Sequence, residues 1–183
     1  MEYHKTDLHY RLLKNIALNV ELLYNDKDTE ISEYDIQAVI SVFLKKNFLN
    51  TEFSINREIF GKFDCAISQK NYKKPVILYE IKTFSKPKEK LNIESAYKKI
   101  EKDIIKLKIG INKYNHSRAY LIIVCKKRDI ENVTFIENFN FVNEHINNSK
   151  KWITRQIDNM DIKIRPSRKV LIERVCVYSW EIK

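Results

Sequence analysis

Three charged residues, Asp64, Glu80 and Lys82, lie in neighbouring strand-like segments at a spacing that could support hydrolysis of a phosphodiester. If the turn between the two segments centres on Tyr72, an antiparallel hairpin places Asp64 directly opposite Glu80. Directly opposed residues share a face of the sheet, with Cβ atoms about 5 Å apart. Lys82 follows Glu80 by two residues and therefore projects from the same face. The spacing predicts two carboxylates and one ammonium group in a single small patch.

Two facing carboxylates repel each other unless a positive group lies between them. A divalent cation removes this repulsion, and Mg²⁺ prefers oxygen ligands while keeping several waters. Such a cation polarises a phosphate and lowers the pKa of a bound water, and a nearby lysine can stabilise that water or accept a proton from it. The string D…E-x-K arises often by chance in a chain with 32% charged residues. Here, however, the charges interrupt the apolar run VILYEI, where they are costly without a partner or a metal.

Hydrophobic periodicity predicts the elements that must position this patch. Apolar residues at helical spacing indicate three helices, over 7–23, from Ser32 onward and over 92–109. Strand-like runs cover four further segments, 52–60, 62–69, 76–83 and 118–125. Short connections make the first three strands antiparallel neighbours, whereas the helix before the fourth strand allows a parallel crossover. The order from Ser32 to Cys125 is α-β-β-β-α-β, which predicts an α/β fold with a mixed, α+β type of sheet.

The helix ends carry their own signals. Asp7 is expected to cap the N-terminus of the first helix, and Ser32 that of the second, with Asp35 at the capping-box position. Gly110 is expected to end the third helix.

The signal weakens beyond Lys126. Residues 137–146 are compatible with a helix, and residues 170–182 with one long strand or two short ones. We therefore expect residues 1–183 to form one domain, with a core over about 32–125, an added N-terminal helix over 7–23 and a C-terminal elaboration over 126–183.

Composition narrows the classes of function. The formal charge of +10 favours a polyanionic partner, although a lysine-rich solvated surface would give the same number. With only two glycines, far apart, the chain can contain neither a Walker A loop nor a dinucleotide-binding fingerprint.

The longest apolar run, 119–125, is too short to cross a bilayer. The three cysteines lie in apolar runs and are expected to be buried thiols, so we expect a reducing, cytoplasmic location and no membrane partner.

These residues resemble the PD-(D/E)XK nuclease superfamily, the fold of many restriction endonucleases. The matching stretches are Gly61-Lys-Phe-Asp64, then Glu80-Ile-Lys82, and a following helix, YKKIEKDIIKL, that is similar to the one after the family's motif. One departure is Phe63, which stands where the family name has proline. The resemblance covers Ser32 to about Cys125 and implies a restriction-endonuclease-like αβββαβ core with an extra N-terminal helix and C-terminal helix and strand additions.

The resemblance also implies residue roles. Asp64, Glu80 and the backbone carbonyl of Ile81 would bind Mg²⁺, for which Mn²⁺ could substitute, and Lys82 would orient or activate the attacking water. The family often adds a glutamate from the helix before the strands, and Glu33 is the best match. The alternative for Glu33 is an acidic residue that interacts favourably with the helix dipole.

Basic residues outside the motif are candidates for contacts with nucleic acid. Lys62, Arg155, Arg165 and Arg168 have the types needed to contact phosphates or bases, and the alternative for each is an ordinary surface charge. Trp152 and Tyr178 are suited to stacking on bases or to packing in the core.

The leading expectation is thus a Mg²⁺-dependent DNA endonuclease of restriction or phage-defence type. A Holliday-junction resolvase, a repair nuclease or a transposon-end nuclease would use the same core, and so would a ribonuclease. A different class is a nucleic-acid-binding protein that kept the fold without cleavage. A homodimer is expected if the chain cuts palindromic sites, because those have two-fold symmetry.

Overall fold

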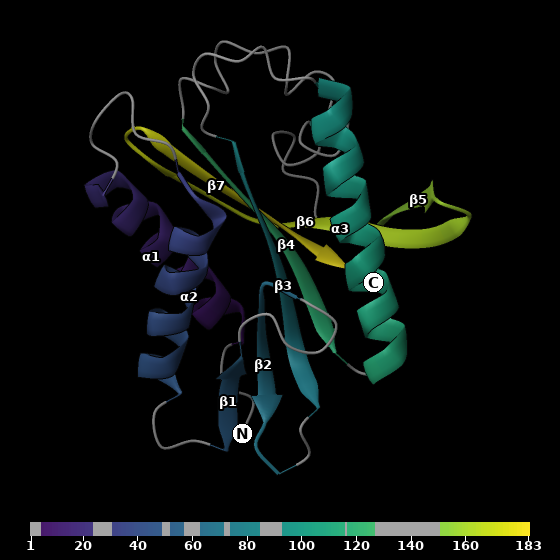
Figure 1. Cartoon of the computed structure of the whole chain (residues 1–183), viewed down its shortest axis with the longest axis horizontal. Coiled ribbons are helices and arrows are strands. Elements are labelled where there is room, and N and C mark those ends of the chain that lie inside the picture. Colours follow the sequence, from purple (N-terminus) through teal and green to yellow (C-terminus); the bar gives the residue numbers. More distant parts are fainter. Residues whose placement is uncertain are drawn as a thin grey trace.

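A computed structural model describes residues 5–23, 31–48, 52–56, 63–71, 74–84, 93–115, 117–126 and 151–183. In this part of the chain, seven strands form one mixed sheet in the order β1-β2-β3-β4-β7-β6-β5. Helices α1 (Lys5–Leu23) and α2 (Glu33–Asn47) cover one face of the sheet, and α3 (Ile93–Tyr114) covers the other (Figure 1). The three layers confirm the predicted mixed α/β architecture at this level.

The predicted order of elements from Ser32 to Cys125 is also present. Strands β1 (Phe53–Asn56), β2 (Cys65–Gln69) and β3 (Pro75–Phe84) are successive antiparallel neighbours. After α3, strand β4 (Arg118–Lys126) returns parallel to β3. A parallel pair needs such a crossover, since the chain must travel the length of the sheet before it pairs again.

Strand β4 lies between two hydrophobic cores. Its side chains alternate, so Leu121 and Ile123 pack in the core under α3, whereas Ile122 and Val124 pack in the core under α1 and α2. All four residues are at most 2% exposed. This two-sided burial explains why the strand reads as a continuous apolar run and not as an alternating one.

Helix α3 corrects the expectation for Gly110. The helix continues to Tyr114, so Gly110 lies inside it and does not cap it. A Cβ at this position would lie 2.5 Å from Phe63 Cζ and 2.7 Å from Leu78 Cδ1. The glycine therefore serves the close approach of α3 to the sheet. Asn115, with a φ of 27°, takes the left-handed conformation typical of a residue that follows a helix.

The two predicted N-caps have different outcomes. Ser32 caps α2 as expected, because its Oγ accepts a 3.1 Å hydrogen bond from the backbone N–H of Tyr34. The prediction for Asp7 is wrong, since α1 already begins at Lys5 and Asp7 lies within its first turn.

The sheet is completed by three strands from residues 151–183. They are β5 (Ile153–Ile157), β6 (Met160–Ile172) and β7 (Val175–Ile182), joined as antiparallel hairpins, and β7 pairs antiparallel with β4. Residues 170–182 thus belong to two strands, of which the first begins earlier, at Met160. The predicted helix over 137–146 lies outside the described residues.

Strand β5 was not predicted, although a signal for it is present. Asp158 and Asn159 have φ values of 48° and 59° and form the two-residue turn between Ile157 and Met160. Two consecutive left-handed residues define the hairpin turn that suits the twist of antiparallel strands, and Asp and Asn tolerate this conformation. The pair Asp-Asn between ITRQI and MDIKI is therefore a readable hairpin signal.

Helix α1 is anchored to the sheet through His9. A 2.8 Å hydrogen bond joins His9 Nε2 to Ser179 Oγ on β7, and the imidazole stacks on Tyr120 with ring centroids 4.2 Å apart. Burial, aided by the charge of Arg168, lowers the pKa of His9 to about 3. The side chain is therefore a neutral part of the core. Among the described residues, no helix combines the length and the apolar character needed to span a membrane.

Candidate active site

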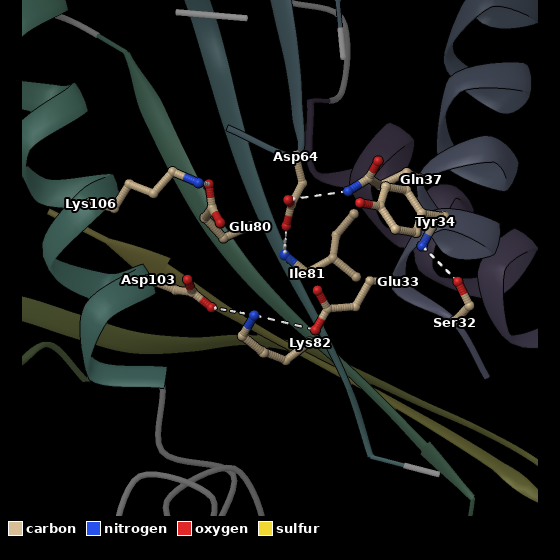
Figure 2. A network of polar contacts seen from close by, with 10 residues as sticks. All are labelled: Ser32, Glu33, Tyr34, Gln37, Asp64, Glu80, Ile81, Lys82, Asp103 and Lys106. Carbon is tan, nitrogen blue, oxygen red and sulfur yellow. Dashed lines mark hydrogen bonds and ion pairs between the residues drawn. The ribbon is translucent and has the colours of Figure 1, made fainter. Parts of the chain in front are cut away.

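The hairpin of β2 and β3 has the register that the sequence predicts. Cys65 pairs with Tyr79 and Ala66 with Leu78, so the next step along the hairpin brings Asp64 beside Glu80. Since the two carboxylates are close, the negative charge of Asp64 helps to raise the pKa of Glu80. The two carboxylates on which the sequence argument depends therefore lie together (Figure 2).

Asp64 lies where β2 separates from β3. The β2–β3 pairing ends at Cys65 and Tyr79, whereas β3 remains paired with β4 as far as Phe84. The backbone N–H of Ile81 points to the side that β2 has left and donates a 2.7 Å hydrogen bond to Asp64 Oδ2. In a strand, the N–H and C=O of one residue point to the same side, so the Ile81 carbonyl faces this edge too.

The second oxygen of Asp64 is held from α2. Gln37 Nε2 donates a 3.1 Å hydrogen bond to Asp64 Oδ1. Gln37 is 3% exposed and follows Glu33 by one helical turn, so both residues lie on the face of α2 that is directed at the strands. Burial raises the pKa of Asp64, while the Ile81 hydrogen bond and the charge of Lys106 act in the opposite direction.

Glu80 is the most deeply buried charge in the site. Its side chain is 2% exposed, and the Lys106 ammonium of α3 lies 2.6 Å from Glu80 Oε1. Burial, and to a smaller extent the charge of Asp64, raises the pKa of Glu80 to about 8. Lys106 acts in the opposite direction and lowers this pKa. With Lys106 in place, a pKa of about 8 still leaves Glu80 mostly protonated at neutral pH, so full ionisation of this carboxylate requires a further cation.

Lys82 is held between two carboxylates from opposite layers. Its Nζ lies 3.2 Å from Glu33 Oε1 on α2 and 3.1 Å from Asp103 Oδ2 on α3 (Figure 2). Burial alone lowers the pKa of Lys82, but the charges of Asp103 and Glu33 outweigh it and raise the pKa above its ordinary value. Lys82 is consequently a fixed ammonium group.

The cluster as a whole has more carboxyl groups than ammonium groups. Four carboxylates, from Glu33, Asp64, Glu80 and Asp103, face two ammonium groups, from Lys82 and Lys106. This local balance is opposite in sign to the +10 of the chain. Among the described residues, no group of three or more acidic, histidine or cysteine side chains is arranged around one metal position. A cation at Asp64 and Glu80 would therefore depend on the Ile81 carbonyl and on water for its remaining ligands.

Sequence reasoning missed three residues of this cluster, namely Gln37, Asp103 and Lys106. Gln37 is a polar residue within the buried stripe of α2, between Ile36 and Ile40, and that position is itself a signal. Asp103 and Lys106 are three residues apart and therefore share a face of α3. The helix contains many other lysines, so this spacing alone does not distinguish Asp103 and Lys106 from solvent-exposed residues. Only the position of the helix on the sheet does so.

The predicted nucleic-acid contacts do not form one group. Arg155 pairs with Ile162, whose side chain lies in the core under α3, so Arg155 shares a sheet face with Glu80 and Lys82. Arg168 lies over Tyr10 of α1, with 5.9 Å from its guanidinium carbon to the ring centroid, and so belongs to the opposite face. Lys62 lies outside the described residues.

Arg165 also lies on the α1 face, where it forms an ion pair with Glu181. Its guanidinium carbon is 4.6 Å from the centroid of Trp152, a ring that is 36% exposed. Tyr178, in contrast, is 3% exposed and stacks on Trp180, so it packs in the core. Strand β6, which carries Arg165 and Arg168, is separated from β3 by β4 and β7.

Comparisons with protein-family models, with curated proteins and with solved structures found no match for this chain. The interpretation of the site therefore depends on its own geometry and chemistry.

Proposed function

We propose that this chain is a Mg²⁺-dependent DNA endonuclease with a restriction-endonuclease-like core. The observation that carries the proposal is the meeting of Asp64, Glu80 and Lys82 at the edge where β2 leaves β3. These residue types suit metal-dependent phosphodiester hydrolysis, and Asp64, directly before β2, lies beside β3 in the register that the spacing predicts.

The donor set fits a hard divalent cation. Asp64, Glu80 and the Ile81 carbonyl would supply three oxygen ligands, and Mg²⁺ or Mn²⁺ binds such ligands together with water. When all four carboxylates are ionised, their excess of two over the ammonium groups equals the charge of one such ion. When bound, the ion would polarise the phosphate and lower the pKa of a coordinated water.

The protein groups around this position have separate tasks. Lys82, as a fixed ammonium group, orients the attacking water and stabilises negative charge near the phosphorus. Glu33 and Asp103 act through Lys82 as positioning residues, because each lies within 3.2 Å of its Nζ. Ile81 and Gln37 hold the Asp64 carboxylate in place from two directions.

The test is metal-dependent nicking of supercoiled plasmid by the wild type and by Asp64→Asn. We expect cleavage with Mg²⁺ or Mn²⁺ and none with EDTA. The variant should lose at least about 100-fold in rate, since loss of even an outer-shell partner typically costs 10–100-fold. Asp161→Asn is the matched control, because Asp161 is an exposed aspartate on β6. Equal rates for wild type and Asp64→Asn would refute the site.

The same assay separates the alternative functions by substrate. Discrete fragments of linear DNA would indicate a restriction enzyme, and preference for a four-way junction a resolvase. Cleavage of RNA in preference to DNA would indicate a ribonuclease. Binding of DNA without cleavage in either metal would indicate a non-catalytic nucleic-acid-binding protein.

A further inference from the structure

Lys106 has no assigned role in the reaction, yet its ammonium group lies closer to Glu80 than any other charged group described. The 2.6 Å contact to Glu80 Oε1 involves a carboxylate that is 2% exposed. A charge this deeply buried costs several kcal/mol unless a partner compensates it. Lys106 provides part of that compensation in the metal-free protein, because it lowers the pKa of Glu80.

The position of Lys106 is built into the fold. Its Nζ lies 5.4 Å from the centroid of the Phe63 ring, which is 3% exposed, so the ammonium group rests on an aromatic face at the base of the site. Such a contact offsets part of the lost hydration of a cation. The charge of Lys106 also acts on Asp64, whose pKa it lowers. One ammonium group thus serves both strand carboxylates.

We propose that Lys106 is an internal counter-ion for Glu80 that a divalent cation must displace when it binds. The inference rests on the proposed function in one respect, since it takes the cation site at Asp64 and Glu80 as given. A divalent ion on these carboxylates and an ammonium group 2.6 Å from Oε1 carry charges of the same sign and would repel strongly at this distance.

Movement toward solvent is easier for Lys106 than for Lys82. The Lys106 side chain is 31% exposed, whereas Lys82 is 17% exposed and its ammonium group contacts carboxylates from two helices. Lys106 can therefore move toward solvent on its flexible stem while Lys82 stays in place. The exchange leaves a cation beside Glu80 both before and after the metal binds.

The experiment titrates Mn²⁺ alone into the full chain, without DNA, and measures bound ion by electron paramagnetic resonance. Lys106→Gln should bind Mn²⁺ at least about fivefold more tightly than the wild type, because the competing charge is gone. Lys102→Gln removes an exposed lysine from the same helix and should change the affinity less than about twofold. Asp64→Asn should abolish the titrated site.

A second measurement does not depend on metal binding. In EDTA, Lys106→Gln should lower the midpoint of thermal unfolding by several degrees, because Glu80 loses its partner. In a Glu80→Gln background, the same substitution should have a much smaller effect. Coupling of this kind identifies a counter-ion and would not arise from a loss of general helix stability.

The outcomes separate this inference from the proposed function. Equal Mn²⁺ affinity for the wild type and Lys106→Gln, or the same gain in Lys102→Gln, overturns the inference and leaves the nuclease proposal intact. A tighter Mn²⁺ site in Lys106→Gln, together with absence of nicking by the wild type, overturns the nuclease proposal alone. Failure of both proteins to bind Mn²⁺ overturns the inference and the metal dependence together.

Discussion

At the scale of single residues, each ionised group of the candidate site is held by a group from another element. Asp64 is held by a backbone N–H of β3 and by a side chain of α2, and Lys82 by one carboxylate from each of two helices. Pre-positioned charges are effective in catalysis because they need little reorganisation during the reaction. Buried ion pairs contribute little to stability compared with well-packed apolar residues, so this arrangement is consistent with the proposed function.

His9 provides a residue-scale prediction about stability and pH. Its pKa is about 3 in the folded protein and 6.5 when exposed, so protonation favours the unfolded state. The stability that the neutral imidazole supports is complete above pH 6.5 and declines as the pH falls toward 3. Between pH 7.5 and pH 5, the wild type should lose about 2 kcal/mol through this residue.

The measurement is urea unfolding of the wild type and His9→Phe at both pH values. His9→Phe keeps an aromatic ring against Tyr120 and cannot titrate, so its free energy of unfolding should fall about 2 kcal/mol less over this interval. Parallel pH dependence in the two proteins would contradict a buried neutral histidine.

At the scale of elements, α3 is the part of the site that the sequence predicts least well. The helix itself follows from periodicity, as do the strands and the register of β2 and β3, since a short turn fixes which residues face each other. The roles of Asp103 and Lys106 do not follow. They depend on how closely α3 approaches β3, which is set by tertiary packing around Gly110.

The boundaries of β5, β6 and β7 are hard to predict from the sequence for a reason that differs from the one for α3. Apolar and polar residues do not alternate regularly over 170–182, because β7 is buried almost throughout whereas β6 is not. A single apolar run of this kind does not reveal where one strand ends and the next begins. The turn at Glu173, with a φ of 31°, lacks the glycine that would have marked it.

Gly110→Ala tests the packing of α3 on the sheet. Alanine favours a helix by about 1 kcal/mol over glycine, but its Cβ would lie within 3 Å of Phe63 and Leu78. Overpacking typically costs about 1–3 kcal/mol, so we expect a net loss of about 1 kcal/mol in the free energy of unfolding. Phe63→Leu should reduce that loss, and a Gly110→Ala protein more stable than the wild type would contradict the close approach.

At the scale of the whole molecule, the sheet separates the three arginines predicted to contact nucleic acid. The face covered by α3 bears the candidate site and Arg155, whereas Arg165 and Arg168 lie on the face covered by α1. A substrate bound at Glu80 and Lys82 approaches from one side of the sheet. If DNA is the substrate, as proposed, the overall charge of +10 would attract it to the protein in general, but only part of this charge would contact the bound strand.

The comparison of Arg155→Gln with Arg168→Gln tests this division. DNA affinity of the wild type should fall steeply between 50 and 200 mM salt. Arg155→Gln should weaken binding and reduce the slope of log K against log salt by about 1. Arg168→Gln should leave the slope unchanged, and fluorescence anisotropy with a labelled duplex measures all three proteins. A salt-independent affinity, or equal effects of the two variants, would contradict the assignment of faces.

The position of β7 has a kinetic consequence. This strand lies inside the sheet, between β4 and β6, yet its partner residues on β4 are 49 to 63 positions away in the chain, from the pair Lys126 and Val175 to the pair Ala119 and Ile182. The β2–β3 hairpin, by contrast, closes through a short local loop, and local loops close fastest during folding. We therefore expect Asp64 and Glu80 to meet early, in a partly folded chain whose sheet is still divided, so that the candidate site assembles before the scaffold that makes it rigid.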